Sequence, residues 1–310
     1  MCSIFGLIDY KNKLSVKQKN KIISVLSKEC EIRGTDATGI AYNYNNQLKV
    51  YKRPIPAHKM RFNIPNKVSV IMGHTRMTTQ GNAKFNYNNH PFTGTVQDNN
   101  FAFAHNGVLF NDIELRFTEN LPKTNIKTDS YVAVQLLEKC NTLDFNSLRY
   151  MSESVEGSFV FTILDKQDNI WFVHGNNPLT IYQYNGFYIY ASTSEILQAT
   201  IKKLGISKPN NVITSIEGDI LKINHLGKIT YGKFTPQHSI SHMWRYVPYY
   251  DFDEQTDKYS YLIDIAKSMG FSEDEIIALL DYGCTADEIE ELLYQPDLLH
   301  QVASELLYAY

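Results

Sequence analysis

The sequence contains little cysteine, and its cysteines are scattered. Cys2, Cys30, Cys140 and Cys284 are the only four in 310 residues, and no two of them form a C-x-x-C motif. Paired cysteines are the usual signature of a disulfide framework or of a cysteine-rich zinc site. The sequence therefore predicts free thiols in a reducing compartment.

The sequence also has neither a large excess of one charge sign nor a long hydrophobic run. The formal net charge is -3, from 30 Lys and Arg against 33 Asp and Glu, which gives no electrostatic basis for binding nucleic acid or an anionic membrane. No stretch approaches the roughly 18 apolar residues of a membrane span, and no charged-then-apolar leader opens the sequence. We expect a cytoplasmic protein that binds neither nucleic acid nor membrane.

Motifs that hold nucleotides are absent too. There is neither a phosphate-binding G-x-x-x-x-G-K-[ST] loop nor a G-x-G-x-x-G dinucleotide fingerprint.

His238 and His242 have the i, i+4 spacing of helical metal ligands, but no third ligand accompanies them in the sequence. The sequence predicts no cofactor and no metal site.

Short runs rich in β-branched and aromatic residues, bounded by Gly, Asn and Asp, fill the first three quarters of the chain. They predict an α+β fold in which helices cover packed sheets. Strands are expected at 3–9, 39–44, 48–52, 68–75, 101–106, 158–165, 170–174, 181–184, 187–191 and 219–224, and helices at 16–30, 129–139 and 192–204.

The rest of the chain has a different pattern. Residues 235–258 are polar and aromatic and predict a linker, whereas residues 259–310 predict a small all-α bundle. Its helices are expected at 261–269, 272–282, 285–294 and 296–309. Ser272 and Glu275 form a capping box at the second of these. The sequence thus predicts a main domain at 1–234, a linker at 235–258 and a helical domain at 259–310.

The most informative residue is the cysteine in the second position. Removal of Met1 would leave Cys2 with a thiol and a free α-amine on one residue. With pKa values of about 8.5 and about 8, the two groups can relay a proton to each other during attack on a carbonyl. Cys2 is therefore a candidate N-terminal nucleophile. The alternative is an arbitrary small residue behind the start methionine.

Five segments give that hypothesis independent support. They are C-S-I-F-G at 2–6, R-G-T-D-A-T-G at 33–39, G-H-T-R at 73–76, H-N-G at 105–107 and T-D-S at 128–130. In this order and spacing they resemble the class II glutamine amidotransferases, which are N-terminal-nucleophile (Ntn) hydrolases. The first segment is most similar to asparagine synthetases, and the second and third to the glutaminase domains of glucosamine-6-phosphate synthase and amidophosphoribosyltransferase. The resemblance implies a four-layer αββα sandwich for residues 1–234.

The same resemblance implies an enzyme that hydrolyses the side-chain amide of glutamine to glutamate and ammonia. Cys2 would attack the amide, while Asn106 and Gly107 would stabilise the oxyanion. Arg76 would bind the α-carboxylate of glutamine, and Asp129 its α-ammonium group. Further residues implied are Thr79 and Gly107 in contact with substrate, and Arg33, Gly34, Asp36 and His74 in support of the site.

Several of these assignments have structural alternatives. In the alternative to substrate binding, Arg76 holds a strand end through an internal ion pair. Asp129 would simply cap the helix that follows it. Arg33 and Asp36 would form a salt bridge within their loop.

Two positions depart from the family pattern. Met77 and Gln80 stand where synthases of the family often carry Trp and His, which predicts an altered loop over bound glutamine. Two other functions therefore stay open, a hydrolase of other γ-glutamyl amides and a non-catalytic binding protein that keeps the fold.

The C-terminal part suggests a partner. It is too short for a synthase domain, so the sequence predicts a separate protein that accepts the ammonia. Met269-Gly270-Phe271, between the first two predicted helices, resembles the loop of a ubiquitin-associated (UBA) bundle and is a candidate docking surface. The alternative is a helical cap that stabilises the main domain.

Overall fold

The computed structural model describes residues 2–237 and 260–307, apart from 283, 285–288, 290–291 and 294–295. The chain divides into two compact units, Met1–Ser241 and His242–Tyr310. Most of the predicted linker, the two histidines considered as metal ligands and most of the helix predicted at 285–294 lie outside the described residues.

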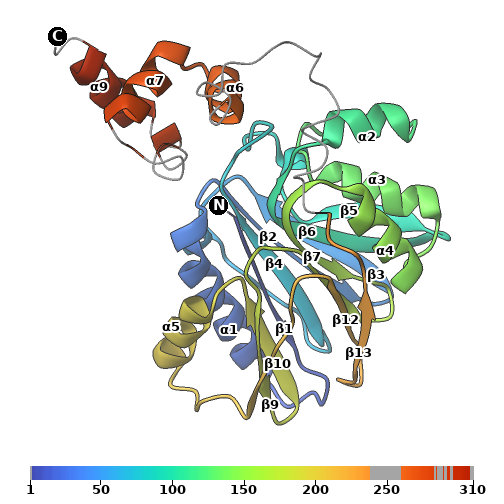
Figure 1. Ribbon diagram of the computed structural model, residues 1–310. Coiled ribbons are helices and arrows are strands. Elements are labelled where there is room, and N and C mark those ends of the chain that lie inside the picture. The colour runs from blue at the N-terminus through green and yellow to red at the C-terminus, as the bar shows by residue number, and fades with distance from the viewer. Residues whose placement is uncertain are drawn as a thin grey trace. The chain divides into compact units, whose positions relative to one another are not determined.

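Two antiparallel sheets form the larger unit (Figure 1). One sheet has seven strands in the order β11 (Asn211–Ile213), β9 (Thr180–Tyr184), β10 (Phe187–Ala191), β1 (Ser3–Ile8), β4 (Val70–Arg76), β2 (Ala37–Tyr44) and β3 (Gln47–Arg53). The other has six in the order β13 (Ile229–Lys233), β12 (Asp219–Ile223), β8 (Ile170–His174), β7 (Gly157–Leu164), β6 (Asn99–Leu109) and β5 (Phe92–Val96).

Helices lie on the outer sides of the sheets. Figure 1 shows α1 and α5 on one side of the unit and α3 and α4 on the other. The helices of this unit are α1 (Val16–Glu29), α2 (Asp112–Thr118), α3 (Tyr131–Cys140), α4 (Phe145–Ser154) and α5 (Ser194–Leu204). The chain also has short 3-10 turns at Cys30–Arg33, Ala57–Lys59 and Asn86–Asn88.

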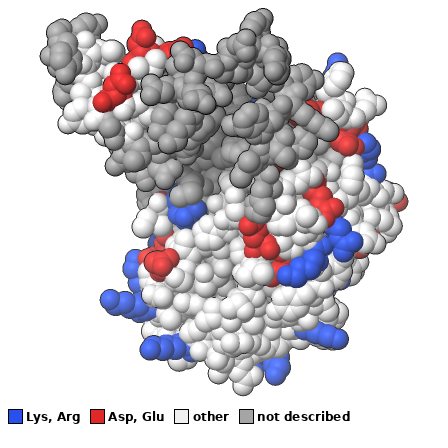
Figure 2. All heavy atoms as spheres, in the orientation of Figure 1, with Lys and Arg blue, Asp and Glu red and all other residues white. Residues whose placement is uncertain are grey.

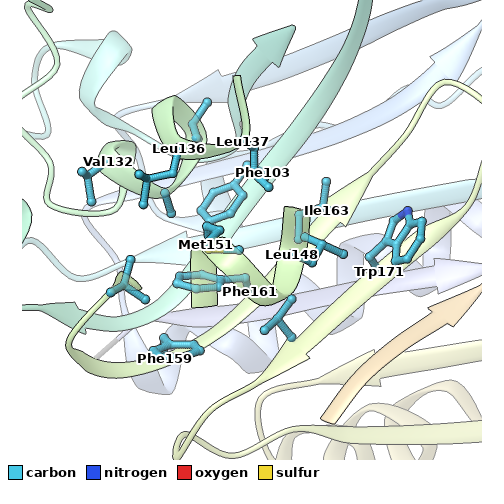
Figure 3. Close-up of a cluster of buried hydrophobic side chains, with 14 of the residues drawn as sticks. Phe103, Val132, Leu136, Leu137, Leu148, Met151, Phe159, Phe161, Ile163 and Trp171 are labelled. Carbon is cyan, nitrogen blue, oxygen red and sulfur yellow. The ribbon is translucent and has the colours of Figure 1, made fainter. Parts of the chain in front are cut away.

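Three clusters of buried apolar side chains hold these layers together. One joins α1 and α5 to the seven-stranded sheet and includes Leu26. A second lies between the sheets and includes Phe172. The third packs α3 and α4 on the six-stranded sheet, where Leu136, Met151 and Phe161 are among its members (Figure 3). Burial of this much apolar surface is the main force that holds the layers in place.

Strand β1 is buried on both faces, which explains its largely apolar sequence. Ile4 belongs to the cluster between the sheets and Phe5 to the cluster under the helices, as the alternation of side chains along a strand requires. A Cβ atom at Gly6 would come within 2.5 Å of the Tyr190 ring, so a larger residue does not fit. β1, between β10 and β4, thus fixes Cys2 at the end of a central strand.

The smaller unit contains three helices among its described residues, α6 (Ser260–Ser268), α7 (Glu273–Tyr282) and α9 (Pro296–Leu307). The predicted capping box is confirmed. The Ser272 backbone N–H and hydroxyl each donate to the Glu275 carboxylate at 2.8 Å, and the Glu275 N–H donates to the Ser272 hydroxyl at 3.3 Å.

The loop between α6 and α7 differs from expectation. Met269 is 44% exposed, but Phe271 is only 4% exposed and belongs to the apolar core of this unit. The expectation that Phe271 is presented for docking is therefore wrong, because the ring is needed for packing. The likeness to a UBA bundle stays a prediction.

The α+β class and all ten predicted strands are confirmed. The sequence interpretation missed β5, β11, β13, α2 and α4. In the described part of the chain, no helix is long and apolar enough to cross a membrane. Figure 2 shows Lys and Arg interspersed with Asp and Glu over the described residues of one face, with no single basic patch.

Candidate active site

Cys2 lies immediately before β1, and its side chain contacts the residue that follows β4. The sulfur is 3.3 Å from the carbonyl oxygen of Met77 and accepts the Met77 backbone N–H at 3.4 Å. Burial raises the pKa of the Cys2 thiol, although the contact with Met77 and the charge of Arg76 act in the opposite direction. The thiol is therefore protonated at neutral pH, and a nucleophilic reaction needs a base beside it.

Part of the R-G-T-D segment contacts both sides of this junction. The Arg33 Nε–H donates to the Cys2 carbonyl oxygen at 2.9 Å. Gly34 packs so closely on the backbone of Arg76 and Met77 that a Cβ atom would come within 2.7 Å of both residues. The structure thus places Arg33 and Gly34 where they fix the main chain on either side of the sulfur.

Asp36 bonds to the backbone on both sides of Met77. Its backbone N–H donates to the Arg76 carbonyl oxygen at 2.9 Å, and its carboxylate accepts the Thr78 N–H at 2.7 Å. Thr79, expected to contact substrate, lies exposed in the loop that follows. The R-G-T-D segment is therefore a positioning element for the end of β4.

Arg76 is buried, with 2% of its surface exposed. Its Nη1 donates to Asn89 Oδ1 at 2.7 Å, and its Nη2 donates to the carbonyl oxygens of Gln80 and, at 3.1 Å, Gly81. Thr128 Oγ1 lies 3.5 Å from Nη2. Among the described residues no carboxylate forms an ion pair with Arg76, so the internal ion pair considered as an alternative is not found.

The T-D-S segment is tied to the H-N-G segment. Asp129 Oδ2 accepts the backbone N–H of Leu109 at 2.7 Å, and Ser130 Oγ lies 2.7 Å from His105 Nδ1. Helix α3 begins at Tyr131, with Ser130 rather than Asp129 at the N-cap position. The alternative in which Asp129 only caps this helix is therefore wrong, because its carboxylate bonds to β6.

Three histidines in or near these segments, His74, His90 and His105, are buried. His74 Nε2 donates to the carbonyl oxygen of His105 at 2.9 Å and so links the two sheets. The His90 ring lies 4.2 Å from that of His74 and 4.3 Å from that of Phe92, and neither of its nitrogens has a hydrogen-bond partner among the described residues. Burial lowers the pKa of all three, that of His74 to about 3. All three rings are neutral at pH 7.

This burial predicts acid sensitivity. Each histidine has a folded pKa below its unfolded value of about 6.5, so its contribution to stability is complete above that pH and is lost as the pH falls. Between pH 7 and pH 5 the free energy of unfolding should fall by about 2 kcal/mol on account of His74, whose folded pKa is about 3, and His90 and His105 should add to this fall. Because the His90 ring has no hydrogen bond to lose, His90→Phe should reduce this fall by one histidine's share. Urea unfolding at both pH values measures it; equal falls in wild type and variant would contradict it.

The H-N-G segment carries a polar group without a partner. The Asn106 side chain is buried, and neither its Oδ1 nor its Nδ2 has a hydrogen-bond partner among the described residues. A buried amide left in that state is costly, and native structures seldom contain one without a reason. The amide is thus available to a ligand.

The next residue has to be glycine. Gly107 has a φ of +145°, and a Cβ atom there would lie 1.9 Å from the Ser158 carbonyl oxygen. Side chains are strained in that conformation and would clash with β7. Gly107 therefore lets the backbone beside Asn106 adopt a shape that no other residue allows.

Hydrogen bonds thus connect all five sequence segments, although they are separated by up to about 125 residues. Sequence interpretation missed Lys52, which donates to the carbonyl oxygen of Asn89, while the Asn89 side chain bonds to Arg76. The inward position of Lys52 in the alternation of β3 was the available signal. No group of three or more possible metal ligands occurs among the described residues.

Part of the chain matches a known protein family. A model of the glutamine amidotransferase domain matches residues 74–199. Residues 74–199 thus belong to a glutamine amidotransferase domain. The match includes Arg76, Asn106 and Asp129, while Cys2 and Arg33 precede it.

Curated relatives extend the similarity beyond the matched domain. The glutamine–fructose-6-phosphate aminotransferase of Streptococcus agalactiae is 28% identical over 259 residues, and that of Sulfurisphaera tokodaii is 30% identical over 243. These alignments cover 74% and 72% of this chain but only 41% and 40% of the relatives. The chain therefore spans about two fifths of the length of the relatives it matches.

Solved structures confirm the fold of the amidotransferase domain. The glutamine phosphoribosylpyrophosphate amidotransferase of B. subtilis aligns with a TM-score of 0.57 at 18% identity, and the allosteric regulatory enzyme of purine biosynthesis with 0.61 at 19%. Each alignment covers 76% of this chain and 49% of the other. Similarity at this identity supports the fold alone.

Proposed function

We propose that the amidotransferase domain hydrolyses the side-chain amide of glutamine to glutamate and ammonia through a thioester on Cys2, within a four-layer Ntn-hydrolase fold. The observation that carries this proposal is the hydrogen-bonded cluster that brings all five segments to one site around Cys2, with the Asn106 amide left unpaired. A nucleophile, an oxyanion donor and a charged clamp in one place are the parts that acyl transfer needs.

In the first half-reaction the Cys2 sulfur attacks the amide carbon of glutamine. Burial keeps the thiol protonated, so the free α-amine left after removal of Met1 takes the thiol proton. The carbonyl oxygen becomes an oxyanion, which the Asn106 Nδ2–H and the Gly107 backbone N–H stabilise. When the C–N bond breaks, the leaving nitrogen takes the proton from the α-ammonium group and departs as ammonia.

In the second half-reaction water attacks the γ-glutamyl thioester. The α-amine removes a proton from the water, and the same two donors stabilise the second oxyanion. Cleavage of the C–S bond then returns the proton to sulfur and releases glutamate. No redox change or cofactor is needed for either half.

The two ends of the amino acid group of glutamine need opposite charges. Arg76 binds the α-carboxylate and Asp129 the α-ammonium group, both from buried positions that strengthen charge-assisted bonds. The carboxylate competes for Arg76 with the Gln80 and Gly81 carbonyl oxygens. We infer that this loop shifts when glutamine binds.

Arg76→Lys should raise the KM for glutamine by about 10- to 100-fold with a smaller effect on kcat, because an ammonium group cannot replace a planar two-point donor. Asp129→Asn should act in the same direction at the other end of the substrate. Steady-state kinetics measure both variants, and Arg53→Lys, on the exposed end of β3, is the matched control. Normal KM values in both site variants would rule out this recognition of glutamine.

The direct test of the proposed function is product analysis. Purified protein incubated with L-glutamine should release glutamate and ammonia in equal amounts. Turnover only with other γ-glutamyl amides would favour the second candidate below. No turnover of either class would leave a binding protein with this fold.

One observation favours other γ-glutamyl amides as substrates. A cavity of about 850 Å³ is lined by Arg33 and Met77, which both contact Cys2, and by Asp36, Thr78 and Ile196 among others. This volume far exceeds that needed for ammonia, since one water molecule occupies about 30 Å³. An amine larger than ammonia would fit in this cavity.

We also propose that the ammonia is used outside the matched domain. The relatives named as glutamine–fructose-6-phosphate aminotransferases continue well beyond the aligned region. A separate synthase would supply the accepting chemistry, with the helices of the smaller unit as its docking site. Co-purification with an enzyme whose product formation depends on glutamine tests this.

A further inference from the structure

Lys52 is the inward-facing lysine of an outer strand. Along β3 the exposed and partly buried residues alternate, and Leu48, Val50 and Lys52 share the partly buried face. Leu48 and Val50 pack on the cluster between the sheets, where apolar side chains are expected. An inward charge on an edge strand can serve simply to prevent pairing with another sheet. The contacts of Lys52 indicate a more specific role.

The Lys52 ammonium group is bonded to the segment that carries Asn89. It donates to the carbonyl oxygens of Asn89 and, at 3.0 Å, Pro91, and it lies 5.2 Å from the centroid of the Phe92 ring. The absence of a side chain at Gly39 permits this approach, since a Cβ atom there would lie 2.3 Å from the His90 carbonyl oxygen. Residues 89–91 are therefore held against β2 and β3.

Asn89 connects residues 89–91 to Arg76, the residue proposed to bind the α-carboxylate of glutamine. Its side chain is fully buried, and its Oδ1 accepts the bond from Arg76 Nη1 at 2.7 Å. Its Nδ2 donates to the Ala83 carbonyl oxygen at 2.8 Å, in the loop that also bonds to Arg76. A continuous set of bonds thus runs from Lys52 through Asn89 to Arg76.

The charges around Lys52 point to an anionic ligand. Burial and the nearby charge of Arg76 lower the pKa of Lys52 to about 8. Within the described part of the chain, no Asp or Glu forms an ion pair with either cation. Two cations in a partly buried place favour a bound carboxylate.

We propose that Lys52 is a positioning residue for glutamine: it fixes residues 89–91 so that Asn89 holds the Arg76 guanidinium in place for the α-carboxylate, and it adds a second positive charge there. This inference rests on the proposed function, because it assumes that Arg76 binds glutamine. It assigns a specificity role to a residue that belongs to none of the five sequence segments.

Lys52→Met should raise the KM for glutamine by about 10-fold, the usual effect of losing one charge-assisted interaction, while kcat changes less than about 2-fold. Lys52→Arg, which keeps the charge and the donors, should restore most of the affinity. Lys49→Met is the matched control, because Lys49 is an exposed lysine on the same strand whose side chain, within the residues that the structure describes, bonds only to Gln47. A normal KM in Lys52→Met, or an equal rise in Lys49→Met, would overturn the proposal. The proposal would also be overturned if Lys52→Met lowered kcat and the thermal midpoint together and Lys52→Arg restored neither.

A binding measurement separates this inference from the proposed function. Calorimetry with L-glutamine should give a dissociation constant about 10-fold weaker for Cys2→Ala/Lys52→Met than for Cys2→Ala alone. If wild type releases no ammonia but this difference is found, the hydrolysis proposal fails and the role of Lys52 stands. If wild type turns over glutamine and the difference is absent, the reverse holds. If Cys2→Ala binds no glutamine and wild type is inactive, both are overturned.

Discussion

Cys2→Ala should reduce ammonia release from glutamine to background, because the variant has no sulfur to form the thioester. The fold should survive, since within the described part of the chain the thiol bonds only to the Met77 backbone. Ammonia measured by a coupled dehydrogenase assay, with circular dichroism as a check on folding, provides the test.

A cysteine elsewhere in the chain supplies the control. Cys140→Ala changes a partly buried thiol at the end of α3, and its turnover should match wild type. Full activity in Cys2→Ala, or loss of activity in Cys140→Ala alone, would place the nucleophile elsewhere.

Asn106→Ala should lower kcat by about 10²- to 10³-fold with little change in KM, the usual effect of removing one oxyanion donor. Because the Asn106 amide has no partner among the described residues, the change breaks no hydrogen bond, and the thermal midpoint should not fall on that account. The same kinetic assay measures the effect.

Asn100→Ala, on the exposed part of the same strand, should leave kcat unchanged. If Asn106→Ala retained wild-type kcat, the Asn106 amide would not be an oxyanion donor, and the unpaired amide would need another explanation. If KM rose while kcat was unchanged, Asn106 would bind the ground state of the substrate instead.

The main strands were predictable because their sequences signal burial directly. β1 and β7 are largely apolar along their length, which is what two-sided burial favours. The missed elements have weaker signals. β5 contains alternating threonine and a glycine, and α4 buries only a narrow face that includes Leu148 and Met151. Short elements of mixed polarity take their structure from the layers they pack against.

The site was predictable to the extent that short motifs carried it. The motifs named Cys2, Arg76 and Asn106, but they did not give the direction of any side chain. Asp129 precedes a helix and has the residue type of a cap, yet its carboxylate bonds to Leu109 on β6. That choice depends on how α3 packs on the sheet, which local sequence does not encode.

Lys52 was missed for a related reason. It lies in a strand whose local pattern is ordinary, and its importance comes from contacts with residues far along the chain. The burial of Phe271 could not be predicted from local sequence either. A phenylalanine in a loop is expected to be exposed, and only the packing of the surrounding helices buries it. Long-range packing decides such positions.

The central claim is that Cys2, as the first residue of the mature chain, is the nucleophile that attacks a γ-glutamyl group. Its most direct test is intact-mass and peptide analysis after treatment with 6-diazo-5-oxo-L-norleucine, a diazoketone analogue of glutamine that alkylates a thiol with loss of N₂. We predict a chain that lacks Met1 and carries one adduct, located on Cys2 and prevented by excess L-glutamine. An adduct on Cys30, Cys140 or Cys284, or turnover of glutamine by protein that fully retains Met1, would contradict the account.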